Sequence, residues 1–128
     1  MLSEKKPSEL AVVGKSPERT DDLEKLTGAA TYVSDMSLPG MLHAQLKKSP
    51  HARARIVRID TSKARAMPGV RAILTGDELD YRLGLYVVDK RILARGEVRH
   101  HGEAVAAVAA DTLMQARAAA DAIEVEYE

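Results

Sequence analysis

The segment 39–70, PGMLHAQLKKSPHARARIVRIDTSKARAMPGV, decides the fold, because strand, break, strand and helix signals follow one another in it with little between them. Residues 41–47 have the composition of a strand, which stops at Ser49-Pro50 because proline lacks the N–H that a central strand donates. Residues 52–60 predict a second strand. The segment contains no nucleophile–base pair, metal-ligand cluster or phosphate-binding loop, so it indicates a structural framework.

A short helix is predicted after the second strand, with Asp60 or Thr61 as its N-terminal cap and Pro68-Gly69 as its end. The same order returns in the last third of the chain, where the strand 104–110 is followed by a second helix. An aspartate ends both strands, and its carboxylate is expected to accept hydrogen bonds from the first N–H groups of the helix, at Asp60 and at Asp111. Each part therefore predicts a βαβ-like unit, with an antiparallel return of the first unit as the alternative.

The sequence AVAAVAA at residues 104–110 is apolar on both faces, which predicts the central strand of the sheet, covered on each side. The helix predicted over residues 112–122 is expected to bury Leu113, Met114, Ala116, Ala120 and Ala122. The final IEVEYE alternates strictly, which predicts a strand with Ile123, Val125 and Tyr127 facing inward and the glutamates facing water.

The beginning of the chain has little apolar surface to bury. Residues 1–18 are therefore predicted to form a flexible N-terminal arm, followed by one domain over residues 19–128. Within that domain, Thr27-Gly28 predicts a turn and residues 29–33 predict a short strand.

Residues 77–102 have the weakest pattern of the chain. A strand is predicted over residues 83–88, and a short extended piece is centred on Val98. The rest is expected to be an irregular loop, and loops of this length inside a compact domain often bear a functional or partner contact.

The composition argues against several classes of function. The 19 basic and 19 acidic residues give a formal net charge of +0, so no overall field attracts nucleic acid or a membrane surface. Aromatic residues make up 3% of the chain, too few for a base-stacking platform. With no cysteine, the chain offers no disulfide or iron–sulfur ligand. No secretory leader pattern and no apolar segment of ~20 residues is present, so a cytoplasmic location is expected.

His100 and His101, beside Glu97 and Glu103, form the one group in the sequence that resembles a metal or acid–base site. Adjacent residues of a strand point to opposite faces, so both imidazoles do not easily reach one ion. No HxH or HxxxH spacing supports a metal site either. A structural role at the start of a strand is therefore the favoured interpretation.

A second histidine pair flanks the break between the first two strands. His43 lies in the first predicted strand, and His51 directly follows Pro50. The two side chains are predicted to face each other across the break. No carboxylate lies nearby in the sequence to hold one tautomer, so a structural role is again favoured.

The strongest local charge is a basic run in the middle of the chain. It consists of Lys47, Lys48, Arg53, Arg55, Arg58, Lys63, Arg65 and Arg71. A solvated face that covers strand edges is the favoured interpretation, and a docking face for an acidic partner or for phosphates is the alternative. No GxGxxG, GxxxxGK[ST] or GxSxG motif is present, so nothing supports nucleotide binding or a serine hydrolase.

Several short motifs occur in a characteristic order: Lys25-Leu26-Thr27-Gly28, Ser49-Pro50-His51-Ala52, Pro68-Gly69-Val70 and Gly102-Glu103. With the surrounding sequence from Arg19 to Glu128, they resemble the N-terminal α/β hammerhead domain of the molybdenum-cofactor subunit in one enzyme family. That family comprises xanthine dehydrogenase, aldehyde oxidase and 4-hydroxybenzoyl-CoA reductase. The resemblance implies an α+β hammerhead fold, a mixed sheet with two helices.

The resemblance also implies a molybdopterin cofactor, iron–sulfur clusters and FAD in the complete enzyme. In the family, the cofactor-binding and catalytic residues lie downstream of the hammerhead domain. No catalytic, cofactor-binding or metal-binding residue therefore carries over to this chain. The chain departs from the family pattern at His100-His101 and at Ala104, which leaves the subfamily and the substrate open.

The resemblance predicts a non-catalytic structural and assembly domain of a molybdopterin-dependent oxidoreductase, working in a hetero-oligomer. Its expected partners are the molybdopterin-binding domains or subunit and the iron–sulfur subunit, with no nucleic acid and no membrane. The basic surface over 47–71 and the loop over 77–102 are the candidate contacts. The alternative is a stand-alone small α/β binding module for an anionic ligand or RNA. A hydrolase or metal enzyme around His100-His101 lacks the further residues it would need.

Overall fold

A computed structural model describes residues 12–79 and 81–128. The chain divides into two compact units, Met1–Leu38 and Pro39–Glu128. Residues 1–11 of the predicted arm lie outside the described residues.

The first unit contains one short helix, α1 (Asp22–Thr27), and one 3-10 turn, η2 (Val33–Asp35). Gly28 ends α1 in the left-handed conformation, with φ +75°, which confirms the predicted turn. The predicted strand over residues 29–33 is wrong. The Asp35 N–H donates to the Tyr32 carbonyl (2.9 Å), and the Tyr32 N–H donates to the Asp35 carboxylate (3.0 Å), so local hydrogen bonds close a helical turn there instead.

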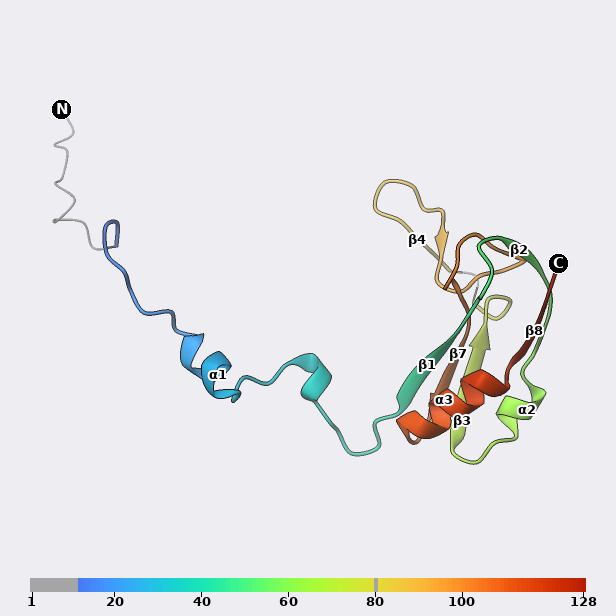
Figure 1. Cartoon of the computed structure of the whole chain (residues 1–128), viewed down its shortest axis with the longest axis horizontal. Helices are drawn as coiled ribbons and strands as arrows, with labels where there is room; N and C mark the ends of the chain where they lie inside the picture. Colours follow the sequence, from blue (N-terminus) through green and yellow to red (C-terminus); the bar gives the residue numbers. More distant parts are fainter. Residues whose placement is uncertain (1–11, 80) are drawn as a thin grey trace. The chain divides into compact units, whose positions relative to one another are not determined.

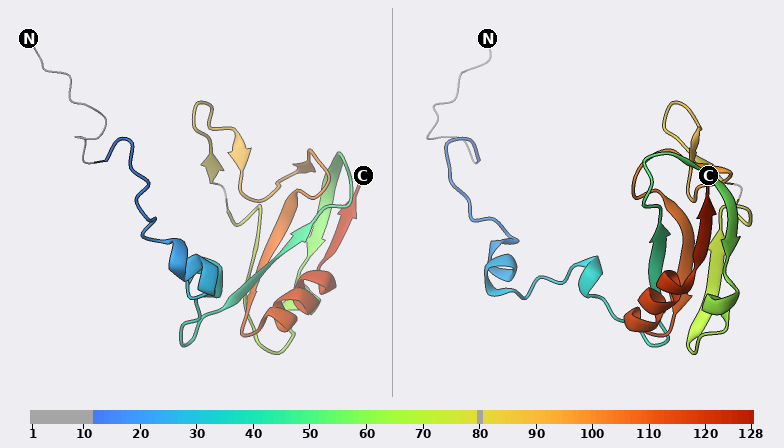
Figure 2. Two further views of the ribbon diagram at one scale, coloured as in Figure 1. Left: turned by 60° about the vertical axis from the view of Figure 1, so that its left-hand side comes forward. Right: turned by 45° about the vertical axis from the view of Figure 1, so that its right-hand side comes forward.

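The second unit contains two three-stranded sheets, in which every recorded strand pairing is antiparallel (Figures 1 and 2). The first sheet has the order β1 (His43–Lys48), β7 (Ala104–Ala110), β3 (Val70–Thr75), and the second has the order β6 (Glu97–Val98), β2 (Ala54–Asp60), β8 (Glu124–Tyr127). Two helices, α2 (Ser62–Arg65) and α3 (Leu113–Ala122), complete this unit. The α+β class and the central position of β7 are confirmed.

Neither predicted βαβ-like unit is present, because the strands on either side of each helix lie in different sheets. The chain passes from β2 through α2 to β3, and from β7 through α3 to β8. Both edges of β7 are occupied, by β1 and by β3, so β8 pairs with β2 instead. Each helix therefore links one sheet to the other.

The two aspartates predicted as helix caps behave differently. Asp60 accepts hydrogen bonds from the Ser62 N–H (2.9 Å) and hydroxyl (2.6 Å), so it holds the start of α2 as predicted. The prediction for Asp111 is wrong, since Thr112 Oγ1 accepts the hydrogen bond from the Gln115 N–H (3.2 Å) and is the side-chain cap of α3.

The main core lies between α3, the first sheet and the start of β8. Ala116, Ala119 and Ala120 of α3 cluster with Ala106 and Val108 of β7. These alanines follow the i, i+3, i+4 spacing of one helix face, and their small side chains allow close approach of the helix to the sheet.

Two of the side chains predicted to be buried in α3 are not. Leu113 is 39% exposed and Met114 is 72% exposed, because the alanine face of the helix turns toward the sheet. The alternation predicted for the last strand is confirmed, with Ile123 buried, Val125 and Tyr127 half-buried and the glutamates exposed.

The region 77–102 contains a short hairpin, β4 (Arg82–Leu83) with β5 (Lys90–Arg91). The predicted strand over residues 83–88 is therefore too long, because the chain turns back after Leu83. The extended piece at Val98 is confirmed as β6, and Val98 joins a second core cluster with Ala94 and Val105. The hairpin lies at the end of the second unit opposite α2 and α3 (Figures 1 and 2). None of the described helices is both long and apolar enough to cross a membrane.

Candidate assembly surface

The motifs Ser49-Pro50-His51-Ala52 and Gly102-Glu103 lie side by side and are joined by backbone hydrogen bonds. The Ser49 N–H donates to the Glu103 carbonyl (2.9 Å), and the Gly102 N–H donates to the Ser49 carbonyl (2.8 Å). The Ser49 hydroxyl, which is buried, accepts a hydrogen bond from the His51 N–H (3.1 Å). The turn after β1 and the turn before β7 therefore form one clamp, and these motifs have a structural explanation.

The Glu103 side chain adds hydrogen bonds to Arg99 on the inner side of this clamp. It accepts hydrogen bonds from the Arg99 N–H (2.6 Å), Nη2 (2.8 Å) and Nε (3.2 Å), and the residue is only 7% exposed. Burial raises the pKa of Glu103, but the hydrogen bonds and charge of Arg99 outweigh it, so the pKa lies below its ordinary value. Folding therefore favours the ionised form of the Glu103 carboxylate.

The Pro68-Gly69-Val70 motif also forms a turn with a structural task. Gly69 has φ +80°, and its carbonyl accepts a hydrogen bond from the Asp111 N–H (2.9 Å). A Cβ at Gly69 would overlap the side chain of Gln115 on α3. The positive φ favours glycine here, whereas the Gln115 amide is the end of a flexible side chain and can move aside.

His100 and His101 are both exposed, and the two glutamates beside them bond elsewhere. Glu103 is held by Arg99, and Glu97 pairs with Arg53 at 3.3 Å. Within residues 12–79 and 81–128, no group of three or more His, Asp or Glu side chains is placed to hold a metal ion. The structure therefore does not gather the described histidines into a site.

The prediction that His43 and His51 face each other is wrong. His43 lies opposite Ala110 at the start of β1, whereas His51 follows the end of that strand. The His51 ring contacts the ring of Tyr127 edge to face, with a centroid distance of 4.8 Å. His51 therefore packs the break against β8.

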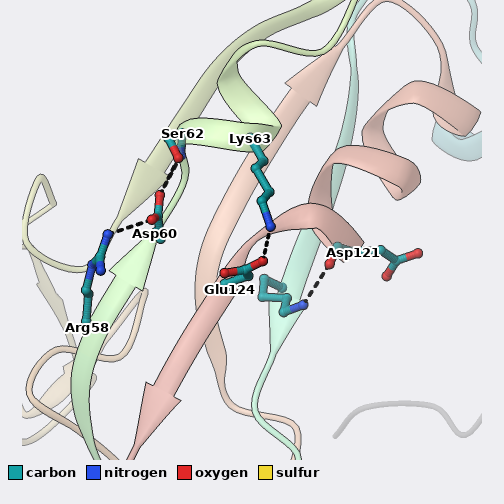
Figure 3. Close-up of polar contacts among 7 residues, drawn as sticks. Arg58, Asp60, Ser62, Lys63, Asp121 and Glu124 are labelled. Atoms are coloured by element: carbon teal, nitrogen blue, oxygen red, sulfur yellow. Dashed lines mark hydrogen bonds and ion pairs between the residues drawn. The ribbon is translucent and has the colours of Figure 1, made fainter.

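The basic run is matched by carboxylates of the same chain. The ion pairs are Arg53 with Glu97, Arg55 with Glu128, Arg58 with Asp60, Lys63 with Glu124, Arg65 with Glu78, and Arg71 with Asp111. Lys47 Nζ donates to the Asp121 carbonyl (3.3 Å), and Figure 3 shows several of these contacts between β2, α2 and β8. Exposed pairs of this kind add little stability, but they remove most of the net positive charge from the surface.

The pKa shifts at these pairs agree with the geometry. The Ser62 hydrogen bonds and the charge of Arg58 lower the pKa of Asp60. The Glu124 carboxylate raises the pKa of Lys63, and Arg71 lowers the pKa of Asp111 through a two-pronged contact at 2.7 and 2.9 Å. The shifts favour the charged forms of Asp60, Lys63 and Asp111, so the surface is a paired mosaic of opposite charges. A dominant cationic face for RNA or phosphates is not formed by these residues.

The hairpin β4–β5 has four consecutive exposed apolar side chains at its tip. They are Leu85 (88% exposed), Tyr86 (94%), Val87 (68%) and Val88 (61%). Contiguous apolar side chains with this exposure mark contact sites in soluble proteins. The sequence predicted a strand over residues 83–88 and indicated the whole loop 77–102 as a candidate contact, and the structure places the apolar run LYVV at the hairpin tip within that loop.

These features define the class of the molecule: an α+β domain whose recurrent motifs form structural turns and whose contact candidates are apolar. Residues 27–128 match the family model described as "Aldehyde oxidase and xanthine dehydrogenase, a/b hammerhead domain". The chain belongs to this family.

Relatives and solved structures agree with this membership. The large molybdopterin subunit of nicotinate dehydrogenase from Eubacterium barkeri is 42% identical over 119 residues, covering 91% of this chain and 28% of that subunit. CO dehydrogenase from Oligotropha carboxidovorans superimposes with a TM-score of 0.84 at 38% identity, over 90% of this chain and 15% of that one. The aldehyde oxidoreductase from Desulfovibrio desulfuricans gives 0.83 at 30% identity, over 90% and 14%. The chain thus spans 28% or less of the length of each.

Proposed function

We propose that this chain is the non-catalytic, N-terminal structural and assembly domain of a molybdopterin-dependent oxidoreductase that hydroxylates aldehydes, heterocycles or aromatic thioesters. The best support comes from two facts about how this chain aligns with its family. The hammerhead family model accounts for residues 27–128, whereas the matched relatives are several times longer than the chain. Residues 19–128 are the proposed domain, preceded by an arm over residues 1–18, and the proposed location is the cytoplasm.

The complete enzyme is proposed to contain molybdopterin, iron–sulfur clusters and FAD, all bound outside this chain. A pterin cofactor needs several buried polar groups that converge on one cavity. Within the described residues, the buried polar residues Ser49 and Glu103 are already bonded inside the clamp, and the buried Tyr127 hydroxyl, which has no hydrogen-bond partner, is a single group. These residues do not fit the cofactor, so we assign no catalytic step to them.

The proposed partners are the molybdopterin-binding polypeptide and the iron–sulfur subunit of a hetero-oligomer. The hairpin tip over residues 85–88 is the proposed contact from the 77–102 loop, because its side chains are apolar and uncovered. The paired mosaic is a weaker candidate for a partner contact than the basic run in the sequence indicated, because its charges are already paired within the chain. The same pairing removes the main support for the RNA or anionic-ligand alternative.

Native purification of the full chain from cells tests the proposal. A molybdenum- and pterin-containing polypeptide is expected to co-purify with it, and Tyr86→Ser is expected to lower the amount recovered without changing the thermal midpoint of the isolated chain. Met114→Ser, on the exposed side of α3, is the matched control. Turnover of an aldehyde or a purine by the isolated chain would overturn the proposal, as would oligonucleotide binding that weakens steeply with salt.

A further inference from the structure

The first sheet has an apolar face that α3 does not cover. Side chains directly opposite each other on paired strands lie on the same face, so the register of β1, β7 and β3 defines two rows. One row is Ala44, Ala109 and Ala72, and the other is Leu46, Ala107 and Leu74. These six residues form what we call the open face.

No other described element of the second unit covers the open face. Leu46 is 43% exposed and Leu74 is 44% exposed. Ala44 and Ala72 are also exposed, while Ala107 and Ala109 of the central strand are half-buried. No polar residue interrupts either row, although a sheet face in contact with water normally has polar side chains at these positions.

The opposite face of the same sheet shows what such a surface accepts. Its central row is Gln45, Val108 and Ile73, and the alanine face of α3 lies on the β7 part of it. The open face likewise has small side chains on the central strand, Ala107 and Ala109, and Leu46 and Leu74 flank Ala107. Small side chains at the centre of a sheet let a helix approach closely, as α3 does on the covered side.

The size of the open face indicates what kind of partner covers it. Six side chains, four of them alanine, offer on the order of a few hundred Å². A stable dimer of independent chains buries about 800 Å² per partner. A second copy of this chain would therefore form too small an interface here, whereas a partner held by further contacts elsewhere can bury a small patch effectively.

We infer that the open face binds an amphipathic helix with an alanine- and leucine-rich stripe, which belongs to the molybdopterin-binding polypeptide. The helix completes a three-layer arrangement of helix, sheet and helix around β7. This inference rests on the proposed function, because that function supplies a larger partner with contacts beyond the open face. It also explains why the AVAAVAA strand is apolar on both faces.

Charge substitutions in the two rows test the inference. Leu46→Asp and Leu74→Asp each place a carboxylate beneath the bound helix, and we expect about a tenfold or greater loss of the co-purified molybdopterin-binding polypeptide. Met114→Asp, on the opposite side of the sheet layer, is the matched control and is expected to have no effect. Circular dichroism of each isolated variant separates loss of binding from loss of folding.

Photo-crosslinking keeps the test decisive if a charged variant fails to fold. A photoreactive phenylalanine derivative replaces Leu46, Leu74 or Met114 in the full chain, and mass spectrometry identifies the crosslinked peptide in the purified complex. Crosslinks from positions 46 and 74, but not 114, to a helix of the molybdopterin-binding polypeptide support the inference. Crosslinks to a second copy of this chain, or none from positions 46 and 74 in an intact complex, overturn it and leave the proposed function standing. Failure of any complex to form overturns the proposed function itself.

Discussion

Glu103→Gln is the sharpest test of how the clamp between the turns at Ser49 and Gly102 is held. The carboxylate accepts three hydrogen bonds from Arg99, at 2.6, 2.8 and 3.2 Å, and the residue is 7% exposed. Glutamine removes the charge and places an NH₂ group against a donor. Hydrogen bonds to charged groups contribute about 1.5–3 kcal/mol, and the Arg99 side chain, 44% exposed, regains water after the change. We therefore expect a loss of about 2 kcal/mol in the free energy of unfolding.

The loss should depend on pH in a defined direction. The pKa of Glu103 in the folded chain lies below its ordinary value of 4.5, so folding favours the ionised form. The stabilisation is therefore fully present above pH 4.5 and disappears as the pH falls through the lower pKa of the folded state. Wild type and Glu103→Gln should differ most at neutral pH and converge in acid.

Urea unfolding followed by circular dichroism, at a series of pH values from neutral to acid, measures both effects. Glu126→Gln is the matched control, because Glu126 is exposed on β8 of the second sheet and is expected to change stability by less than ~0.5 kcal/mol. Equal unfolding midpoints of wild type and Glu103→Gln at neutral pH would refute the reasoning. A difference that stays constant down to acid pH would show that the charge is not the cause.

Other substitutions test the core, one turn and the ion-paired surface. Ile123→Ala, at a position that is 1% exposed, should cost about 3 kcal/mol in thermal or urea unfolding, whereas Met114→Ala should cost less than ~0.5 kcal/mol. Similar losses for the two variants would contradict the assignment of the core. Gly69→Ala should lower the free energy of unfolding by about 1 kcal/mol, because the backbone has φ +80°, a conformation that a Cβ disfavours. An unchanged midpoint would show that the turn relaxes freely. Arg71→Met should cost less than ~1 kcal/mol, since its ion pair is exposed, and a larger loss measured in low salt would mean that the pair is structural.

Local sequence signals predicted the order of the elements well but not their partners. Proline at position 50 ends β1, and the strict alternation of the last six residues places Ile123 in the core. The predicted βαβ-like units failed because β8 pairs with β2, a choice made by contacts about 70 residues apart in the chain. Asp111 failed as a cap because the neighbouring Thr112 takes that position, and the Asp111 carboxylate pairs with Arg71 of β3 instead.

For the candidate contact surfaces too, the sequence revealed the residue types, and the fold decided which of them lie together. The basic run was visible in the sequence, but its neutralisation required the fold to bring Glu97, Glu124 and Glu128 beside it. The apolar character of β7 was also visible, and covering on both sides was the prediction. The register of β1 and β3 decides which residues share each face of the first sheet, and within the described residues of the second unit one of the two faces has no covering element.

The sequence by itself determined the class of fold, the family motifs, the break after β1 at Pro50 and the inward and outward sides of the last strand. These properties depend on backbone chemistry and on periods of two or 3.6 residues, which neighbouring residues establish without the rest of the chain. Only the tertiary structure decided which sheet each strand joins, how the basic run is ion-paired, how Ser49 and Glu103 form the clamp, and which residues form the open face. These depend on which distant residues come into contact, and a period along one element contains no information about its partner.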